Sequence, residues 1–154
     1  MTQSQSWPAL CIYAGEDGTS HLVDLDLPTT RKVVGEDGTT RWEGIASAST
    51  FGLAGGGQSP TYSEWHTCGQ AGLSITLRGN WEIEAGDGTR RALGPGDLLV
   101  MLDTTGQGHR SWPLGDSPSM VMGLGFGEGV EATMRERLDG ALRRRAGVSN
   151  ANGR

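Results

Sequence analysis

Apolar and polar residues alternate in short stretches along most of the chain, up to about residue 126. Successive side chains of a β-strand point to opposite faces, so this period of two predicts strands with one buried face. The predicted strands cover residues 10–14, 21–27, 40–47, 50–54, 61–68, 73–77, 81–85, 90–93, 98–102, 109–112 and 120–126. Many short strands separated by turns are typical of an all-β barrel or sandwich.

The turns between these strands carry recognisable hairpin chemistry. The sequences GEDGTS (15–20), GEDGTT (35–40) and AGDGTR (85–90) each contain Asp-Gly, a pair that favours tight β-hairpin turns. The chain has 26 glycines, which suits a turn-rich protein because glycine adopts a positive φ at little cost. We therefore expect a hairpin at each of the three sequences.

The pattern changes after residue 129, where apolar residues recur every four positions. These residues are Val130, Met134, Leu138 and Leu142. Such spacing places apolar side chains along one side of a helix. We predict one amphipathic helix over about residues 130–145 that closes the domain, followed by a flexible tail over residues 147–154.

Composition narrows the class of protein. A chain of 154 residues with 35% hydrophobic content fits one soluble domain, over residues 1–146. No apolar run approaches the roughly 20 residues that cross a bilayer, and no signal peptide is visible, so we expect a cytoplasmic protein without a membrane partner. The net charge of −5 argues against nucleic acid as a partner, because phosphate binding needs clustered Lys and Arg.

The stretch YSEWHTCGQAG, residues 62–72, holds the most reactive side chains. On a strand, one face would carry Tyr62, Glu64, His66 and Cys68, and the other would carry Trp65. If the polar face points into a barrel, it forms the polar part of a small-molecule pocket. If it points to solvent, Trp65 is the core residue, and the alternation alone favours neither arrangement.

A longer stretch, LRGNWEIEAGDGTRRALGPGDLLVMLDTTGQGH (77–109), resembles the core of a small single-domain cupin. The resemblance is carried by the turn glycine Gly79, the Gly-Pro-Gly-Asp turn at residues 94–97 and the Gly-x-Gly-His sequence that ends at His109. The last part, LDTTGQGH, looks most like short bacterial cupins that include some polyketide cyclases. The resemblance implies a double-stranded β-helix, or jelly-roll barrel, with its core motifs within residues 60–112 and a small-molecule substrate.

The resemblance also implies where metal ligands would stand. The family's first motif is normally a His-x-His pair followed by a carboxylate or Gln, and the second motif adds a histidine. Counted back from Gly79, the first-motif positions fall on His66, Cys68 and Gly72, and the second-motif histidine falls on His109. Two imidazoles and a thiolate suit zinc, whereas non-haem iron usually wants a carboxylate. We therefore predict one divalent ion, zinc before iron, held by His66, Cys68 and His109.

Neighbouring side chains leave several roles open. Glu64 or Gln70 could replace the missing carboxylate or hydrogen-bond a metal-ligating histidine. A charged histidine beside Cys68 would instead lower the pKa of the thiol and make it a nucleophile. The remaining alternative is a metal-free pocket in which the histidines hydrogen-bond each other or a ligand. Asp103 begins the loop that leads to His109, and we expect it to hold that loop.

These features favour an enzyme that isomerises, cyclises or dehydrates a small organic molecule at a carbonyl or enol in specialised metabolism. A metal would polarise the carbonyl, and Tyr62, Glu64, Gln70 or Cys68 would take part in the catalysis as proton carrier or nucleophile. The alternatives are a non-haem iron dioxygenase and a metal-free ligand-binding or sensory cupin. The resemblance and the unpaired edge of the first strands also imply a homodimer.

Overall fold

The computed structural model of the protein describes residues 6–44, 48–56 and 64–151. The elements, in chain order, are β1 (Ser6–Ala14), β2 (Ser20–Val34), β3 (Thr40–Gly44), β4 (Ala48–Gly56), β5 (Gly72–Arg78), β6 (Asn80–Ala85), β7 (Arg90–Leu93), β8 (Leu98–Leu102), β9 (His109–Leu114), β10 (Ser119–Phe126) and α1 (Val130–Ala151). The chain is mostly β with one C-terminal helix, as the alternating pattern predicts.

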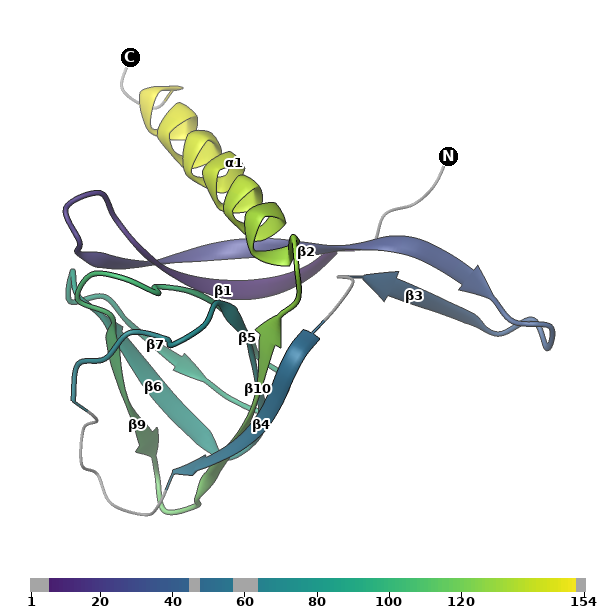
Figure 1. Ribbon diagram of the computed structural model, residues 1–154, viewed down its shortest axis with the longest axis horizontal. Helices are drawn as coiled ribbons and strands as arrows, with labels where there is room; N and C mark the ends of the chain where they lie inside the picture. Colours follow the sequence, from purple (N-terminus) through teal and green to yellow (C-terminus); the bar gives the residue numbers. More distant parts are fainter. Residues whose placement is uncertain (1–5, 45–47, 57–63, 152–154) are drawn as a thin grey trace.

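The strands form two sheets that face each other (Figure 1). The larger sheet has seven strands in the order β3-β2-β1-β8-β5-β10-β4, and the smaller has three in the order β7-β6-β9. All neighbouring strands are antiparallel except β1 and β8, which are parallel. Within the described ranges the two sheets do not join into a closed barrel, so the jelly-roll barrel stays a prediction.

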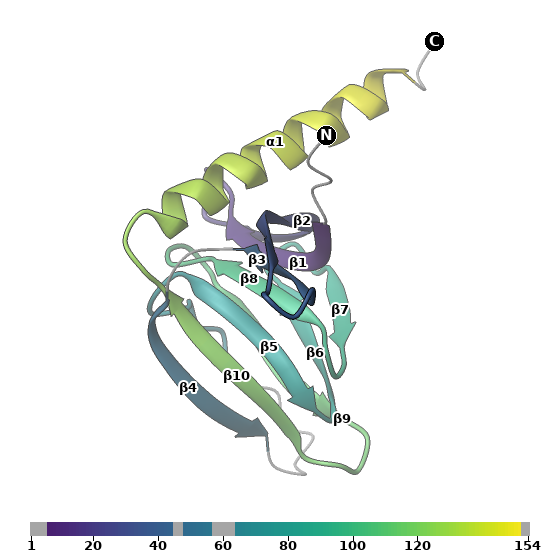
Figure 2. The same ribbon diagram turned by 90° about the vertical axis from the view of Figure 1, so that its right-hand side faces the viewer.

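Helix α1 lies across β1 and β2 on the outer side of the larger sheet (Figures 1 and 2). Its predicted apolar positions Val130, Met134 and Leu138 are buried, and they belong to one core cluster with Cys11 and Val100 of the sheet. Burying this stripe stabilises the helix, since isolated helices are marginal in water. The helix continues to Ala151, past its predicted end at residue 145.

A second core cluster fills part of the space between the two sheets. Leu10 and Leu99 of the larger sheet meet Trp81 and Ile83 of the smaller one in this cluster. Residues directly opposite each other on neighbouring strands share a face of the sheet. Ala85, also in this cluster, lies opposite His109, and Ile83 lies opposite Ser111. His109 and Ser111 therefore lie on the face of β9 that looks into the space between the sheets.

Residues 64–68 do not form the strand that the sequence predicts. His66 makes an isolated bridge with His109, whereas the backbone N–H of Cys68 donates to the carbonyl of Asp103, over 3.3 Å. Because His66 pairs with β9 whereas Cys68 pairs with the loop after β8, residues 64–68 do not form one continuous strand. Residues 57–63, including Tyr62, lie outside the described ranges, so its predicted role stays a prediction.

Strand β2 is much longer than predicted and extends beyond β1. The pairing with β1 ends at Pro28, and the rest of β2 pairs with β3 as a hairpin arm that leaves the body of the molecule (Figure 1). The arm turns at residues 35–40, one of the predicted Asp-Gly hairpins. No helix in the part of the chain that the structure describes is long and apolar enough to span a membrane.

Candidate functional site

His66 and His109 form the centre of the candidate site. The N–H of His66 donates to the carbonyl of His109 at 3.0 Å, and the N–H of His109 donates to the carbonyl of His66 at 2.8 Å. Their ring centroids are 4.4 Å apart, with the ring planes inclined by 58°. The side chain of His109 is buried and that of His66 is exposed, so the pair connects the space between the sheets with solvent.

Both histidines are held at Nδ1 by an oxygen atom. His109 Nδ1 lies 2.6 Å from Oδ2 of Asp103, and His66 Nδ1 lies 2.8 Å from the backbone carbonyl oxygen of Glu64. A carbonyl or carboxylate oxygen accepts hydrogen bonds, so we place the proton of each neutral ring on Nδ1. Each Nε2 then carries a lone pair, and neither has a hydrogen-bond partner among the residues described.

Asp103 does more than hold the loop that leads to His109. Its side chain is fully buried at the end of β8 and bonds directly to the imidazole of His109. Its other oxygen, Oδ1, is buried without a hydrogen-bond partner of ordinary geometry in the described part of the chain. A buried carboxylate that accepts the Nδ1–H of a histidine fixes the tautomer and orientation of the ring, an arrangement that suits a proton acceptor.

Cys68 packs beside Asp103, and its surroundings favour the neutral thiol. The residue is buried, and burial is the main reason why the pKa of Cys68 is raised to about 12. The negative charge of Asp103 and a hydrogen bond from the thiol to Asp103 act in the same direction. Nucleophilic catalysis and zinc binding both use the thiolate. Both hypotheses for Cys68 stay predictions, and the protein alone does not provide the positive surroundings that a reactive thiolate needs.

We expect Cys68 to react slowly with a thiol reagent in the folded protein, because reagent access and thiolate formation are both suppressed. Cys11 is fully buried and serves as the internal comparison, since burial also raises its pKa to about 12. Labelling with 5,5′-dithiobis(2-nitrobenzoate) should be slow for both cysteines in buffer and rapid for both in urea. Rapid labelling in buffer that disappears in Cys68→Ala would contradict this expectation and revive the nucleophile hypothesis.

The structure places Gln70 away from the two histidines. Its amide nitrogen donates to Ser49 Oγ at 2.7 Å and to the carbonyl of Phe126 at 3.2 Å, and its Oε1 accepts a hydrogen bond from Thr50 at 3.5 Å. These bonds connect the segment before β5 with β4 and β10. In this arrangement Gln70 supports the sheet, and its predicted catalytic role would require it to leave these partners.

Glu64 and Gly72 occupy the other predicted positions. The side chain of Glu64 is exposed, and the contact that the structure gives it with His66 is through the backbone carbonyl. At Gly72, a Cβ would overlap the backbone carbonyl oxygen of Leu124 on the neighbouring strand. The close approach of β10 thus leaves room only for glycine at this position.

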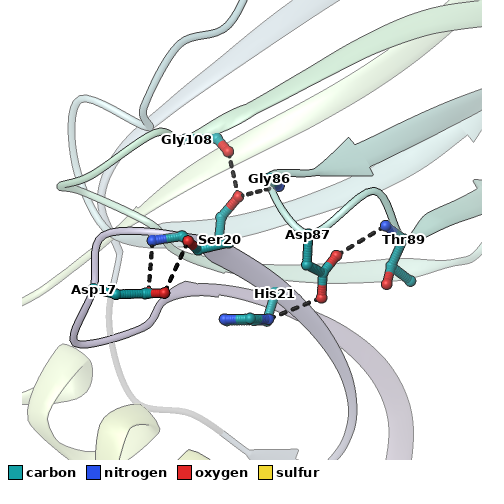
Figure 3. A network of polar contacts seen from close by, with 8 residues as sticks. Asp17, Ser20, His21, Gly86, Asp87, Thr89 and Gly108 are labelled. Atoms are coloured by element: carbon teal, nitrogen blue, oxygen red, sulfur yellow. Dashed lines mark hydrogen bonds and ion pairs between the residues drawn. The ribbon is translucent and has the colours of Figure 1, made fainter.

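Three loops meet at Ser20, beside Gly108, the residue that precedes His109 (Figure 3). The fully buried hydroxyl of Ser20, on the first hairpin, donates to the carbonyl of Gly108 at 2.5 Å and accepts from the N–H of Gly86 at 2.6 Å. Beside it, Asp87 Oδ2 lies 2.8 Å from Nδ1 of His21. Ser20 therefore joins both Asp-Gly hairpins to the loop that presents His109, whereas the contact between His21 and Asp87 joins the two hairpins to each other.

A metal site with three protein ligands is not assembled in the described part of the chain. There, no group of three or more His, Cys, Asp and Glu side chains is arranged to hold a metal ion. The two histidines fit one part of such a site, since metal-ligating histidines usually give their other ring N–H to an oxygen acceptor. Two imidazoles alone fall short of the three protein ligands that zinc enzymes use.

The position of Trp65 tests whether this residue belongs to the core, which the alternation of residues 62–68 left open. It is 37% exposed, with the guanidinium of Arg110 stacked 5.0 Å from its ring centroid, so it is not a core residue.

Comparison with known proteins adds no assignment: neither the models of known protein families nor the curated proteins include one that matches this chain.

Proposed function

We propose that this protein is a cupin-like enzyme that moves a proton on a small organic molecule, next to a carbonyl group and without redox chemistry. Isomerisation, cyclisation and dehydration all include such a step. The observation that carries the proposal is the buried pair of Asp103 and His109, whose 2.6 Å contact leaves Nε2 of His109 available beside His66. The cupin resemblance of residues 77–109 supports it independently.

The proposed reaction begins with Nε2 of His109 as general base. It takes a proton from the carbon next to the carbonyl, the C–H bond breaks, and its electron pair forms the enolate. The charge of Asp103 stabilises the imidazolium that results. In a substrate with a C=C bond next to the reacting carbon, the anion is a dienolate, and returning the same proton to its γ-carbon shifts the double bond and completes an isomerisation. The exposed His66 provides a route for exchange of that proton with solvent.

Proton exchange tests this function without knowledge of the natural substrate. We expect the protein to catalyse exchange of the C1 hydrogens of 2-tetralone, a cyclic ketone that enolises readily, in deuterated buffer, as followed by NMR. His109→Ala should lower the catalysed rate by about 100-fold or more, because general base catalysis contributes 10²–10⁴. His21→Ala is the matched control and should retain the rate. Exchange equal to the buffer background, or unchanged in His109→Ala, refutes the proposal, and ligand binding without exchange favours the binding or sensory cupin.

A metal-assisted form of the reaction is the second candidate, and the orientation of both histidines by oxygen acceptors favours it. When bound, a divalent ion would polarise the carbonyl as a Lewis acid. The prediction is about one zinc per chain, lost in both His66→Ala and Cys68→Ala, by elemental analysis of protein purified without chelators. If Cys68→Ala retains its zinc, the thiolate of Cys68 is not a zinc ligand. Iron in its place would favour the dioxygenase, whose usual carboxylate ligand cannot stand at Gly72.

The homodimer stays a prediction, and the outer face of β4 is where we expect the second copy to bind. Strand β4 is an edge of the larger sheet, and its outward side chains Phe51 and Leu53 are 76% and 62% exposed. An apolar edge strand can pair with its own copy across a two-fold axis. Sedimentation should give twice the chain mass, and Phe51→Ser with Leu53→Ser should give the monomer. A native monomer at micromolar concentration would contradict the prediction.

A further inference from the structure

The inner face of the larger sheet changes from large to very small side chains between β1 and β4. The register across the strands defines two rows, each of which lies on the face that looks toward the smaller sheet. One row is Leu10, Leu99, Ser74, Gly123 and Gly52, and the next is Ile12, Met101, Gly72, Gly125 and Thr50. Leu10, Ile12 and Leu99 on the β1 and β8 half belong to the core cluster between the sheets, whereas the positions of these two rows on β5, β10 and β4 carry only glycine, serine or threonine.

The backbone does not require glycine at two of these positions. Gly52 and Gly123 are direct partners on β4 and β10, and neither has a positive φ. A Cβ at either residue would meet no atom of the described residues within 4 Å, so these residues leave room for a larger group at both positions. Glycine weakens a strand interior and often marks a place where another molecule approaches the backbone closely. The pair therefore forms a flat wall of bare backbone in front of an open volume.

Ser74 adds a polar group to this wall. It lies opposite Gly123 in the same row and is 94% buried (6% exposed), yet its hydroxyl has no hydrogen-bond partner among the described residues. The next inward residue of β5, Thr76, accepts a hydrogen bond from Nε1 of Trp81 at 2.8 Å. A hydroxyl without a protein partner bonds to water or to a bound molecule, because an unmet hydrogen bond costs free energy. The hydroxyl of Ser74 is therefore available to hydrogen-bond a ligand.

Building on the function proposed above, we propose that Gly52, Gly123 and Ser74, the glycine wall, bind a planar, ring-containing substrate that carries a carbonyl or hydroxyl oxygen. The ring face lies on the bare backbone of Gly52 and Gly123, where a flat molecule makes more contact than a puckered one. The hydroxyl of Ser74 bonds to the ring oxygen. His109, on the facing inner surface of β9, then approaches from the other sheet.

Binding of matched ligands tests the glycine wall by equilibrium dialysis. The planar ligand is 2-naphthol, which has the shape of the 2-tetralone enol, and its comparisons are naphthalene, without the oxygen, and decahydro-2-naphthol, with a puckered ring. We expect 2-naphthol to bind at least about ten-fold tighter than the puckered alcohol. Gly123→Val should weaken the binding of both 2-naphthol and naphthalene by about ten-fold or more, because the new side chain takes the place of the ring. Gly147→Val, the same change on the exposed end of α1, should alter neither.

Ser74→Ala separates the oxygen contact from the ring contact. This change should weaken the binding of 2-naphthol by about three- to ten-fold, the usual contribution of one neutral hydrogen bond, and leave the binding of naphthalene unchanged. Equal binding of planar and puckered alcohols, no saturable binding of 2-naphthol, or unchanged binding in Gly123→Val overturns the inference. The proposed function fails separately: if His109→Ala binds 2-naphthol normally and the native protein exchanges no tetralone hydrogen, the ligand class stands and the proton transfer does not.

Discussion

Asp103→Asn should slow hydrogen exchange of 2-tetralone by about 100-fold or more while the protein stays folded. The asparagine amide is similar in size and shape to the carboxylate but has no charge to stabilise the imidazolium of His109. Its NH₂ group can also donate to Nδ1 and move the ring proton to Nε2, where the lone pair is needed. Because Asp103 Oδ1 lacks a partner of ordinary geometry in the described chain, we expect the free energy of unfolding to change by no more than about 1 kcal/mol.

Asp87→Asn provides the matched control for this experiment. Asp87 Oδ2 lies 2.8 Å from Nδ1 of His21, so the same change is made in a second Asp–His pair of the protein. This pair belongs to the hairpin network of Figure 3 and is well exposed, and its loss should leave the exchange rate within about two-fold. Nitrogen-15 NMR of the His109 ring should report the altered tautomer in Asp103→Asn alone. An unaltered rate with an altered tautomer would show that Asp103 positions the ring without serving catalysis.

Local patterns were enough to predict most of the fold. The period of two identified the strands on both sides of the first and third Asp-Gly turns and the strand after the second, and the period of four identified the helix with Val130, Met134 and Leu138 buried as expected. These signals work because each side chain's burial follows from its place in its own element. The length of β2 was missed, because its outer part pairs only with β3 and carries no alternating core face.

The candidate site depended more on contacts between distant segments. Parity within a strand grouped Glu64, His66 and Cys68, but residues 64–68 form no strand, and the exposed side chain of Glu64 and the buried thiol of Cys68 have different surroundings. The pairing of Asp103 with His109 depends on how one loop folds, which periodicity does not encode. The sequence does carry a signal for Ser74: Gly72, Ser74 and Thr76 form a small, polar face on a strand whose other face is Leu73, Ile75 and Leu77.

Gly108→Ala should be the most destabilising single change at the site. Gly108 has φ of 73°, a conformation that costs an alanine about 1–2 kcal/mol. A Cβ there would also overlap the carbonyl oxygen and carbon of His66, which are backbone atoms held by the two hydrogen bonds to His109. Ser20 fixes the Gly108 carbonyl from the other side, so the loop has little room to move away. We expect the free energy of unfolding to fall by about 4 kcal/mol or more in urea titrations.

Gly88→Ala isolates the steric part of that loss. Gly88 has φ of 83° at the tip of a hairpin, and a Cβ there would meet no atom within 4 Å. Its free energy of unfolding should therefore fall only by the conformational cost of about 1–2 kcal/mol. The difference in unfolding free energy between the two variants then measures the cost of the close contact between residues 66 and 108. Equal losses would mean that the segment carrying His66 is free to move away from β9. The two imidazoles would then not be held beside each other, and the proton route from His109 to solvent would have no fixed path.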